Sequence, residues 1–275
     1  MLKRISCPDP RKACGECLLN SKCVYARIFE PQFPSPLRRY TFVPRPYVLS
    51  TSPDCHHGKS LTFDLTLIGH AAEDLPYFIY ACYLLGKEGI GRNKSKLDLQ
   101  WVKLVRPSGE EQTIYTSQTE TLEANCPPVT WTECVKGING SRVVSRITLL
   151  FHSPLRIKER GDLVVDLSFP VFASRLKERI DLLSHLYCGG PVPREDKEIN
   201  SLAREITVEK HSLRWQEMER YSTRQKAKMK LGGLIGMITF RGNLNPFIPY
   251  LILGQYIHVG QGTTFGLGKY EILKW

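Results

Sequence analysis

The sequence predicts an α+β fold made of two similarly organised halves, each a sheet with helices on one face. The chain has 275 residues, a length that suits two ordinary domains, and its 42% hydrophobic and 24% charged residues are near globular averages. Strand-like and helix-like patterns alternate along it, and their order repeats. We therefore place an N-terminal domain at 1–140, including an arm rich in Cys and Pro, and a C-terminal domain at 141–275.

The repeat in element order links the two halves. A strand ending at Gly69 is followed seven residues later by Pro76, and a strand ending before Gly242 is followed seven residues later by Pro249. In both halves an apolar, helix-like run follows, and then a Gly-x-Gly-basic segment at 89–92 and 266–269. This order indicates that both halves are built in the same way.

The elements of the first half follow from local patterns. The prolines of residues 1–60 indicate an irregular arm with short strands, such as 24–29. Apolar and polar residues alternate over 61–68, which is typical of a half-buried strand. Asp74 and Pro76 predict the capped start of a helix that runs to about Leu85 and stops at Gly86, before a strand near 97–105.

The second half begins with a predicted strand at 143–151. Apolar residues at helical spacing predict a helix near 171–187, and the Gly, Pro and charged residues of 189–200 predict a linker. A strand-like segment at 221–230 and a strand at 234–240 follow. The apolar segment 246–253 and a glycine loop complete the chain.

The charge of the chain favours a polyanionic partner. Lys and Arg number 38 against 27 Asp and Glu, a net charge of +11, which suits a nucleic acid or an anionic membrane surface. The longest apolar run, 77–86, is too short to cross a bilayer, and residues 1–10 lack the apolar core of a signal peptide. We therefore expect a soluble cytoplasmic protein without a membrane partner.

Four of the nine cysteines are close together in sequence: Cys7, Cys14, Cys17 and Cys23. The odd total and the absence of an export signal argue against a disulfide framework. A Cys-x2-Cys turn can present two thiolates to one tetrahedral zinc, so the four predict a structural zinc site. The alternative is four reduced thiols.

A row of basic residues marks the segment 220–230. At strand period Arg224, Lys226, Lys228 and Lys230 fall on one face, and no acidic residue lies between Tyr221 and Lys230. We expect these residues, with Arg220 and with Arg92 and Lys94 of the loop 89–94, to contact RNA. An ordinary solvated strand face is the alternative.

The strongest local signal is a loop with four glycines in nine residues, followed by a lysine: Gly260, Gly262, Gly266, Gly268 and Lys269. Glycines let the backbone approach a ligand, and exposed amides can hold phosphate. Phe265 stands where a dinucleotide fingerprint needs its third glycine, and Lys269 is followed by Tyr270, which excludes a phosphate-binding P-loop. A turn that closes a sheet is the alternative.

The segment 260–270 resembles the C-terminal glycine-rich signature of the RAMP superfamily and, within it, the CRISPR precursor-RNA processing endoribonucleases of the Cas-six family. Further segments resemble the same family: 14–17, 23–25, 29–31, 46–49, 67–69, 75–78 and 220–225. The resemblance implies two ferredoxin-like domains in tandem. It also implies a role in CRISPR antiviral defence, in which the protein binds CRISPR repeat RNA, cuts it once and works with other CRISPR effector subunits as possible partners.

The resemblance also implies a metal-independent ribonuclease that needs no catalytic cofactor. A 2′-OH attacks the adjacent phosphate, which requires a base, an acid and a cation for the phosphorane. Relatives suggest His70 as base, Tyr80 as the orienting or protonating group and Lys96 as the cation, while His258 is a second candidate base. The alternatives are that His70 caps the helix start, that Tyr80 belongs to the core, and that the pair His56 and His57 is catalytic.

The sequence is also compatible with two other functional hypotheses. One is a subunit that holds the CRISPR RNA without cutting it. The other is a basic RNA-binding protein unrelated to CRISPR. His152, His185 and His211 are expected to be structural or surface residues in all three readings.

Overall fold

The computed structural model describes residues 1–31, 43–51, 56–57, 60–91, 93–123, 127–136, 143–222 and 227–275. The chain divides into two compact units. One comprises Met1–Pro46 with Leu67–Cys134, and the other comprises Tyr47–Thr66 with Val135–Trp275. The domain limits 1–140 and 141–275 stay a prediction, and the assignment of 47–66 to the second unit had no counterpart in the sequence patterns.

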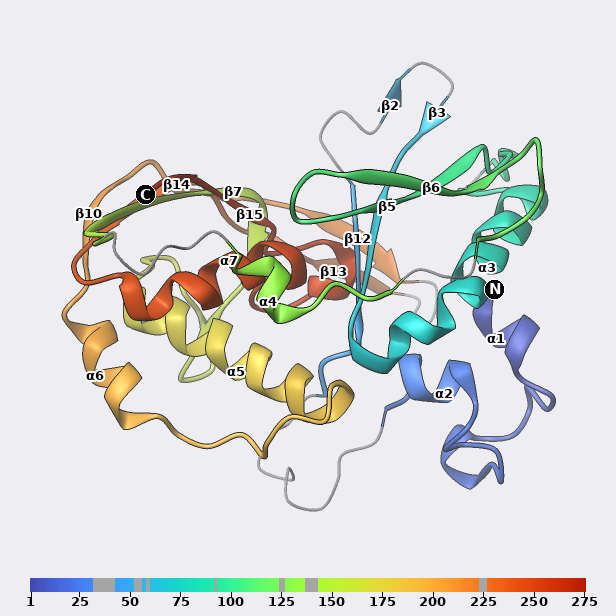
Figure 1. Ribbon diagram of the computed structural model, residues 1–275, viewed down its shortest axis with the longest axis horizontal. Helices are drawn as coiled ribbons and strands as arrows, with labels where there is room; N and C mark the ends of the chain where they lie inside the picture. The colour runs from blue at the N-terminus through green and yellow to red at the C-terminus, as the bar shows by residue number, and fades with distance from the viewer. Residues whose placement is uncertain are drawn as a thin grey trace. The chain divides into compact units, whose positions relative to one another are not determined.

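The second unit is built on one antiparallel sheet (Figure 1). Its elements in chain order are β7 (Arg146–Leu155), α5 (Phe169–Tyr187), β10 (Thr207–His211), β14 (Gly233–Arg241), α7 (Ile248–Ile257) and β15 (Tyr270–Lys274). The strand order across the sheet is β10-β14-β7-β15, and β11 (Arg214–Gln216) also pairs with β14. This βαββαβ connectivity with the first and third strands at the centre is the ferredoxin-like arrangement.

Helices α5 and α7 lie on the same side of this sheet, as does α6 (Lys197–Arg204) (Figure 1). The alternation along β7 explains the packing, because Ile147, Leu149 and Phe151 are at most 2% exposed. Phe151 meets Phe172 of α5 edge-on, with ring centroids 5.8 Å apart. A single aromatic-rich core therefore holds the helices on the sheet.

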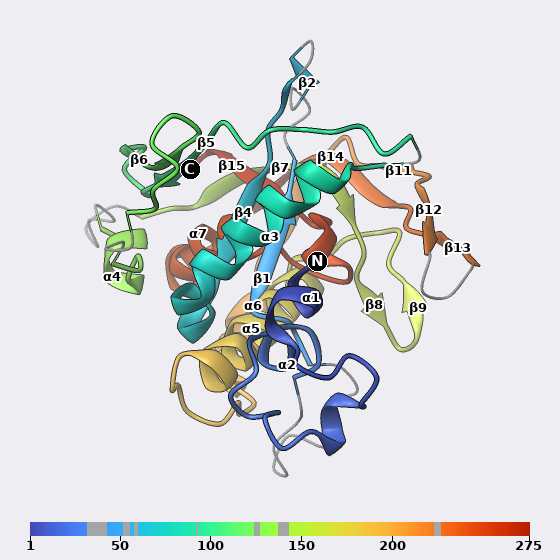
Figure 2. The ribbon, with the colours of Figure 1, turned by 90° about the vertical axis from the view of Figure 1, so that its right-hand side faces the viewer.

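The second unit also contains short hairpins and turns. Its remaining elements are β1 (Tyr47–Ser50), β2 (His56–His57), β3 (Ser60–Leu61), β4 (Asp64–Leu67, whose last residue falls in the first unit), β8 (Lys158–Glu159), β9 (Asp162–Leu163), β12 (Glu219–Ser222), β13 (Ala227–Lys230) and the 3-10 turns η4 (Asn245–Phe247) and η5 (Thr263–Phe265). The hairpins β8–β9 and β12–β13 extend away from the sheet (Figure 2). β1 pairs with β4, and β2 pairs with β3.

The first unit is centred on the helix α3 (Leu75–Glu88), with which α1 is in contact. Its other elements are α1 (Leu2–Ser6), η1 (Cys14–Glu16), α2 (Val24–Phe29), η3 (Gly69–Asp74), the hairpin of β5 (Trp101–Val105) and β6 (Glu111–Thr116), and α4 (Trp131–Cys134). No helix in the described ranges is long and apolar enough to cross a membrane.

The predicted α+β class is confirmed, and so is the repeat in element order. Pro76 stands in the first turn of α3 and Pro249 in the first turn of α7, and each helix follows a strand and a short turn. A proline is tolerated there because the first amides of a helix have no intrahelical acceptor.

Several local predictions were wrong for identifiable reasons. The segment 24–29 is the helix α2, which packs on α1 instead of forming a strand. Asp74 does not cap α3 with its side chain, because it pairs with Arg27. Helix α3 continues through Gly86, where the absence of a side chain lets the backbone of Leu97 approach.

Two segments of the second half also differ from expectation. The segment 189–200 contains the start of α6, where the Asp196 carboxylate accepts a hydrogen bond from the Ile199 amide at 3.1 Å. The segment 221–230 does not form one strand, because its described residues belong to two antiparallel strands, β12 and β13, with Tyr221 opposite Lys228.

Candidate functional site

The glycine loop joins α7 to β15 and is held by its backbone. Gly260, Gly262, Gly266 and Gly268 all have positive φ values, between 69° and 88°, which side chains other than glycine's strain to adopt. The Gly268 amide donates to the Pro154 carbonyl at 3.1 Å, and the Ser153 hydroxyl donates to the Gly266 carbonyl at 2.7 Å. The loop is therefore fastened to the end of β7.

Hydrogen bonds within the loop decide which amides can reach a ligand. The amides of Gly266 and Gly268 donate to Thr263 and Pro154, so they are not available to a phosphate. Those of Gly260 and Gly262 donate to no acceptor among the residues that the structure describes. Any phosphate contact by this loop should therefore involve Gly260 and Gly262.

His258 is part of the support of this loop. Its side chain is buried, with the residue only 2% exposed, and Nδ1 lies 3.3 Å from the Leu267 carbonyl oxygen. Burial, together with the charges of Lys269 and Arg179, lowers the pKa of His258 to about 4. A neutral, enclosed imidazole bonded to the loop is suited to holding the loop in place rather than to taking a proton from RNA.

The buried His258 makes stability depend on pH. Because the pKa of this imidazole is about 4 in the folded chain and 6.5 when exposed, the unfolded chain binds a proton between these values and the folded chain does not. The stabilisation is complete above pH 6.5 and is lost as the pH falls toward 4. Urea unfolding should show that His258 accounts for about 3 kcal/mol of this loss.

The control is His258→Asn, because asparagine replaces the imidazole by a polar side chain that does not titrate. The variant should lose less stability than the wild type between pH 7 and pH 4. Equal losses in the two proteins would show that His258 titrates normally.

Arg179 is a residue that the sequence patterns did not single out. It is buried on α5, and its Nε donates to the carbonyl of Ile257 in the last turn of α7 at 3.0 Å. Its Nη2 has no partner among the described residues, and burial lowers the pKa of the guanidinium to about 10. A cation at this helix end suits the dipole of α7 and fixes the point where the glycine loop begins. The sequence feature that could have identified Arg179 is its charge within the apolar pattern of the predicted helix 171–187.

The hairpin β12–β13 contacts the glycine loop through a cation–π pair. The Arg220 guanidinium carbon lies 4.0 Å from the centroid of the Phe265 ring. Lys228 and Lys230 alternate with Met229 along β13 and are exposed, so two of the predicted basic residues share one face. The Lys228 ammonium is 3.7 Å from the Glu219 carboxylate. Arg224 and Lys226 lie outside the described residues.

The other predicted basic residues differ in their surroundings. Lys269 forms an ion pair with Asp64 at 3.3 Å. Lys94 is exposed in the turn that follows α3 and has a positive φ of 47°. Arg92 lies outside the described residues.

His70 lies in η3, at the predicted strand-to-helix turn, and is half-buried. It lies near Asp74, which is 4% exposed and accepts hydrogen bonds from Arg27 at 2.8 and 2.9 Å. Burial raises the pKa of Asp74, while Arg27 and then His70 oppose that rise. The predicted position of His70 at the strand-to-helix turn is therefore confirmed. Its charged neighbours, Asp74 and Arg27, were not predicted from the sequence.

Helix α3 separates His70 from Lys96. His70 precedes the helix, whereas Leu97, next to Lys96, donates to the Gly86 carbonyl near the other end at 3.0 Å. At 1.5 Å per residue, Leu75 to Gly86 spans about 16 Å. Tyr80 lies between them on α3 and is 53% exposed. The structure does not bring the three side chains to one phosphate, so their joint role stays a prediction.

His56 and His57 form the short strand β2 opposite β3, and only their backbone is described. A catalytic role for this pair stays a prediction.

The four clustered cysteines are described and free of disulfides. Burial raises the pKa of Cys14, and the nearby thiols of Cys23 and Cys7 are among the further causes. Among the described residues, however, no group of three or more His, Cys, Asp or Glu is arranged to hold a metal ion. The thiols as they lie do not fit a zinc ion, and the predicted site would require residues 7–23 to rearrange.

Elemental analysis tests the zinc prediction. If Cys7, Cys14, Cys17 and Cys23 bind zinc, the purified protein should contain about one equivalent of metal, and Cys14→Ser with Cys17→Ser should remove it. Cys188→Ser is the control, because this exposed cysteine lies in the other unit. A metal-free protein that is fully folded would leave four reduced thiols.

Comparison with known proteins adds to this geometry. Residues 149–270 match the model of the CRISPR-associated endoribonuclease Cas6, and residues 1–127 match the model of an N-terminal domain family. No curated protein matches the chain at a significant level. The Cas6 match covers the glycine loop and most of the ferredoxin-like sheet, but only the first residue of β15.

Solved structures show the fold of most of the chain. A Cas6 product complex from Thermus thermophilus has a TM-score of 0.55 at 17% identity, covering 85% of this chain and 83% of that chain. A second Cas6 product complex has a TM-score of 0.51 at 14% identity and covers 87% of each chain. A chain of a Cas6-RT-Cas1–Cas2 complex has a TM-score of 0.50 at 16% identity, covering 82% of this chain and 24% of that chain. These matches confirm the predicted tandem ferredoxin-like fold, and residues 149–270 form a domain that matches the CRISPR-associated endoribonuclease Cas6 family.

Proposed function

We propose that this protein is an endoribonuclease that binds CRISPR repeat RNA and cuts it at one site. The observation that carries the proposal is the Cas6 match over 149–270, the part of the chain that contains most of the sheet, the glycine loop and its buried support. The net charge of +11 supports an RNA partner. The proposal extends to other CRISPR effector subunits as partners.

The proposed reaction is a metal-independent transesterification. The 2′-oxygen of the RNA bonds to the adjacent phosphorus, and the bond from phosphorus to the 5′-oxygen of the next nucleotide breaks. The products are a 2′,3′-cyclic phosphate and a 5′-OH, and the proton taken from the 2′-OH is balanced by one delivered to the leaving oxygen. The protein needs to move these two protons and stabilise the phosphorane charge.

We assign the base to His70, because it lies beside charged partners at the start of α3 and is half-exposed, whereas His258 is enclosed. Tyr80 remains the proposed orienting group. Lys96 can stabilise the same phosphorane only if the segment after α3 moves, because it lies at the other end of that helix.

The RNA is proposed to lie along the hairpin β12–β13. Replacing Lys228 and Lys230 by alanine should weaken binding and flatten the dependence of log K on log salt by about one to two units, because each lysine that contacts a phosphate releases its counterion. The measurement is RNA affinity at several salt concentrations. Lys158→Ala with Lys177→Ala is a control of equal charge, since Lys177 is paired with Asp181 on α5 and Lys158 lies on a different hairpin. If the slope of log K against log salt is unchanged in the hairpin variant, Lys228 and Lys230 do not contact RNA phosphates.

The proposal is tested by incubating the full chain with its repeat RNA and with a shuffled RNA of equal composition. We expect one cut in the repeat and none in the shuffled RNA. Tight binding of the repeat without a cut would instead show a non-cleaving subunit, a reading favoured by the separation of His70 from Lys96. Equal binding of both RNAs without a cut would indicate a general RNA-binding protein.

A further inference from the structure

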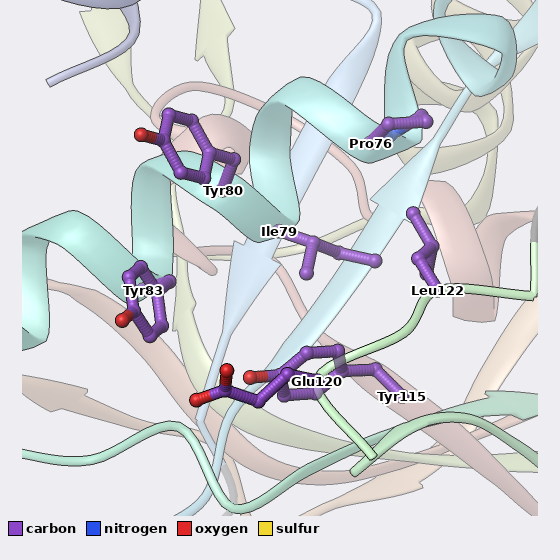
Figure 3. Close-up of a pocket in the computed structure, with 7 residues that line it drawn as sticks. All are labelled: Pro76, Ile79, Tyr80, Tyr83, Tyr115, Glu120 and Leu122. Atoms are coloured by element: carbon purple, nitrogen blue, oxygen red, sulfur yellow. The ribbon is translucent and has the colours of Figure 1, made fainter. Parts of the chain in front are cut away.

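A pocket of about 240 Å³ lies in the first unit between α3 and the loop that follows β6 (Figure 3). Pro76, Ile79, Tyr80, Tyr83, Tyr115, Glu120 and Leu122 line it. Three tyrosines and one carboxylate around an open space are a chemically distinctive lining. The proposed function uses only Tyr80 of this set.

One wall of the pocket is a pair of stacked aromatic rings on α3. The rings of Tyr80 and Tyr83 have centroids 6.2 Å apart and planes inclined by 14°. The Lys87 ammonium lies 5.5 Å from the centroid of the Tyr83 ring and is fixed by an ion pair with Asp98 at 2.7 Å. Tyr83 is thus in contact with a fixed cation, while Tyr80 is 53% exposed and offers aromatic surface to a planar ligand.

The opposite wall comes from β6 and the turn after it (Figure 3). Tyr115 is 9% exposed and pairs with Leu122 across the turn, which gives this wall a fixed apolar base. Glu120 lies in the turn with a positive φ of 50°, and its amide donates to the Thr116 carbonyl at 3.1 Å. Its exposed side chain makes no hydrogen bond or ion pair with any described residue, so the carboxylate can bind a ligand.

The volume of the pocket and the chemistry of its lining indicate which class of ligand fits it. Drug-sized ligands occupy about 300–1,000 Å³, so this smaller pocket suits a single planar ring system rather than a whole nucleotide. Single-stranded RNA is recognised by stacking of bases on aromatic side chains and by hydrogen bonds to their edges. A carboxylate accepts two parallel N–H donors, and among the four bases guanine presents two such neighbours, N1–H and the 2-amino group.

A small organic cation could also stack on tyrosines beside a carboxylate. The net charge of +11 favours a polyanionic partner over a cationic one, and Lys87 places a positive charge beside the Tyr83 ring. Both observations favour a base carried on a phosphate backbone.

We propose that this pocket binds one unpaired guanine of single-stranded RNA, which stacks on Tyr80 and Tyr83 and donates to the Glu120 carboxylate. The inference rests on the proposed function only in taking RNA as the partner. It adds a base-specific contact in the first unit to the phosphate contacts proposed for the second.

The test uses short RNA that requires neither a CRISPR repeat nor cleavage. Affinities of the full chain are measured for a uridine heptamer and for heptamers in which the central uridine is replaced by guanine, inosine or adenine. We expect the guanine heptamer to bind at least 5-fold more tightly than the others, because inosine lacks the 2-amino group and adenine lacks N1–H. Glu120→Gln should remove this preference, and Tyr83→Ala should weaken the guanine heptamer about 5- to 100-fold.

Two matched controls separate the pocket from the general surface. Tyr77→Ala removes a tyrosine of α3 that is 44% exposed and does not line the pocket, and Glu110→Gln removes an exposed carboxylate that precedes β6. Both should retain the guanine preference, and circular dichroism should show every variant folded.

The proposal is overturned if wild-type protein shows no guanine preference, or if Glu120→Gln and Tyr83→Ala both retain it. It is also overturned if agmatine, a guanidinium probe, binds in a manner that depends on Glu120 while the heptamers do not. Because repeat cleavage is measured separately, failure of the pocket and failure of the nuclease proposal give different results.

Discussion

Replacing His70 by alanine is expected to slow single-turnover cleavage of the repeat RNA by roughly 10²–10⁴-fold while leaving RNA affinity nearly unchanged. The reason is that a general base acts on the 2′-OH in the transition state and contributes little to ground-state binding. His70 is the described histidine that is both half-exposed and next to the ionic cluster of Asp74 and Arg27. The measurement uses excess enzyme, so that product release does not limit the observed rate.

Three comparisons make this result specific. His211→Ala is the matched control, because this exposed histidine lies on β10 of the other unit and should cut at the wild-type rate. Lys96→Ala tests whether the lysine reaches the phosphorane despite its place at the other end of α3. If His70→Ala cuts normally and only His258→Asn is slow and stably folded, the base lies at the glycine loop and the assignment to His70 is wrong.

Gly268→Ala is expected to destabilise the second unit by about 2–5 kcal/mol. Gly268 has a φ of +69°, a left-handed conformation that costs an alanine about 1–2 kcal/mol. A β-carbon there would also collide with the carbonyl of Val259, which is fully buried and cannot move aside. Overpacking of this kind adds about 1–3 kcal/mol. The free energy of unfolding in urea measures the sum.

Gly189→Ala separates the two causes. Gly189 has a similar φ of +72°, but a β-carbon there would meet nothing within 4 Å, so only the conformational cost of about 1–2 kcal/mol remains. A loss in Gly268→Ala no larger than in Gly189→Ala would show that the loop can shift away from Val259. The close packing of the glycine loop would then not be required for the fold.

Hydrophobic patterns predicted the helices and strands whose formation depends mainly on their own local sequence. Alternation in β7 and helical spacing in α5 were sufficient because each buries one face of an amphipathic segment. The helix α2 was missed because a short, mostly apolar run of six residues fits a strand equally well, and packing on α1 decides the outcome. The end of α3 was misplaced because Gly86 serves close approach to Leu97 rather than helix termination.

In the candidate site, too, only the features that depend on local sequence could be predicted. The glycine loop and the place of His70 were visible in the sequence, because turn chemistry and a strand-to-helix junction are local features. The burial of His258, the buried Arg179 and the pocket around Glu120 could not be seen, because each depends on residues far apart in sequence. The separation of His70 from Lys96 likewise follows from the length of α3 and from the bond between Leu97 and Gly86.

The most direct test of the nuclease proposal compares two repeat RNAs in EDTA. One is all-ribose, and the other carries a single 2′-deoxy sugar immediately upstream of the cut. We predict that the full chain cuts the first once, leaving a 2′,3′-cyclic phosphate and a 5′-OH, and binds the second equally well without cutting it. Cleavage of the deoxy-substituted RNA, or cleavage that appears only when a divalent cation is restored, would contradict the proposed mechanism.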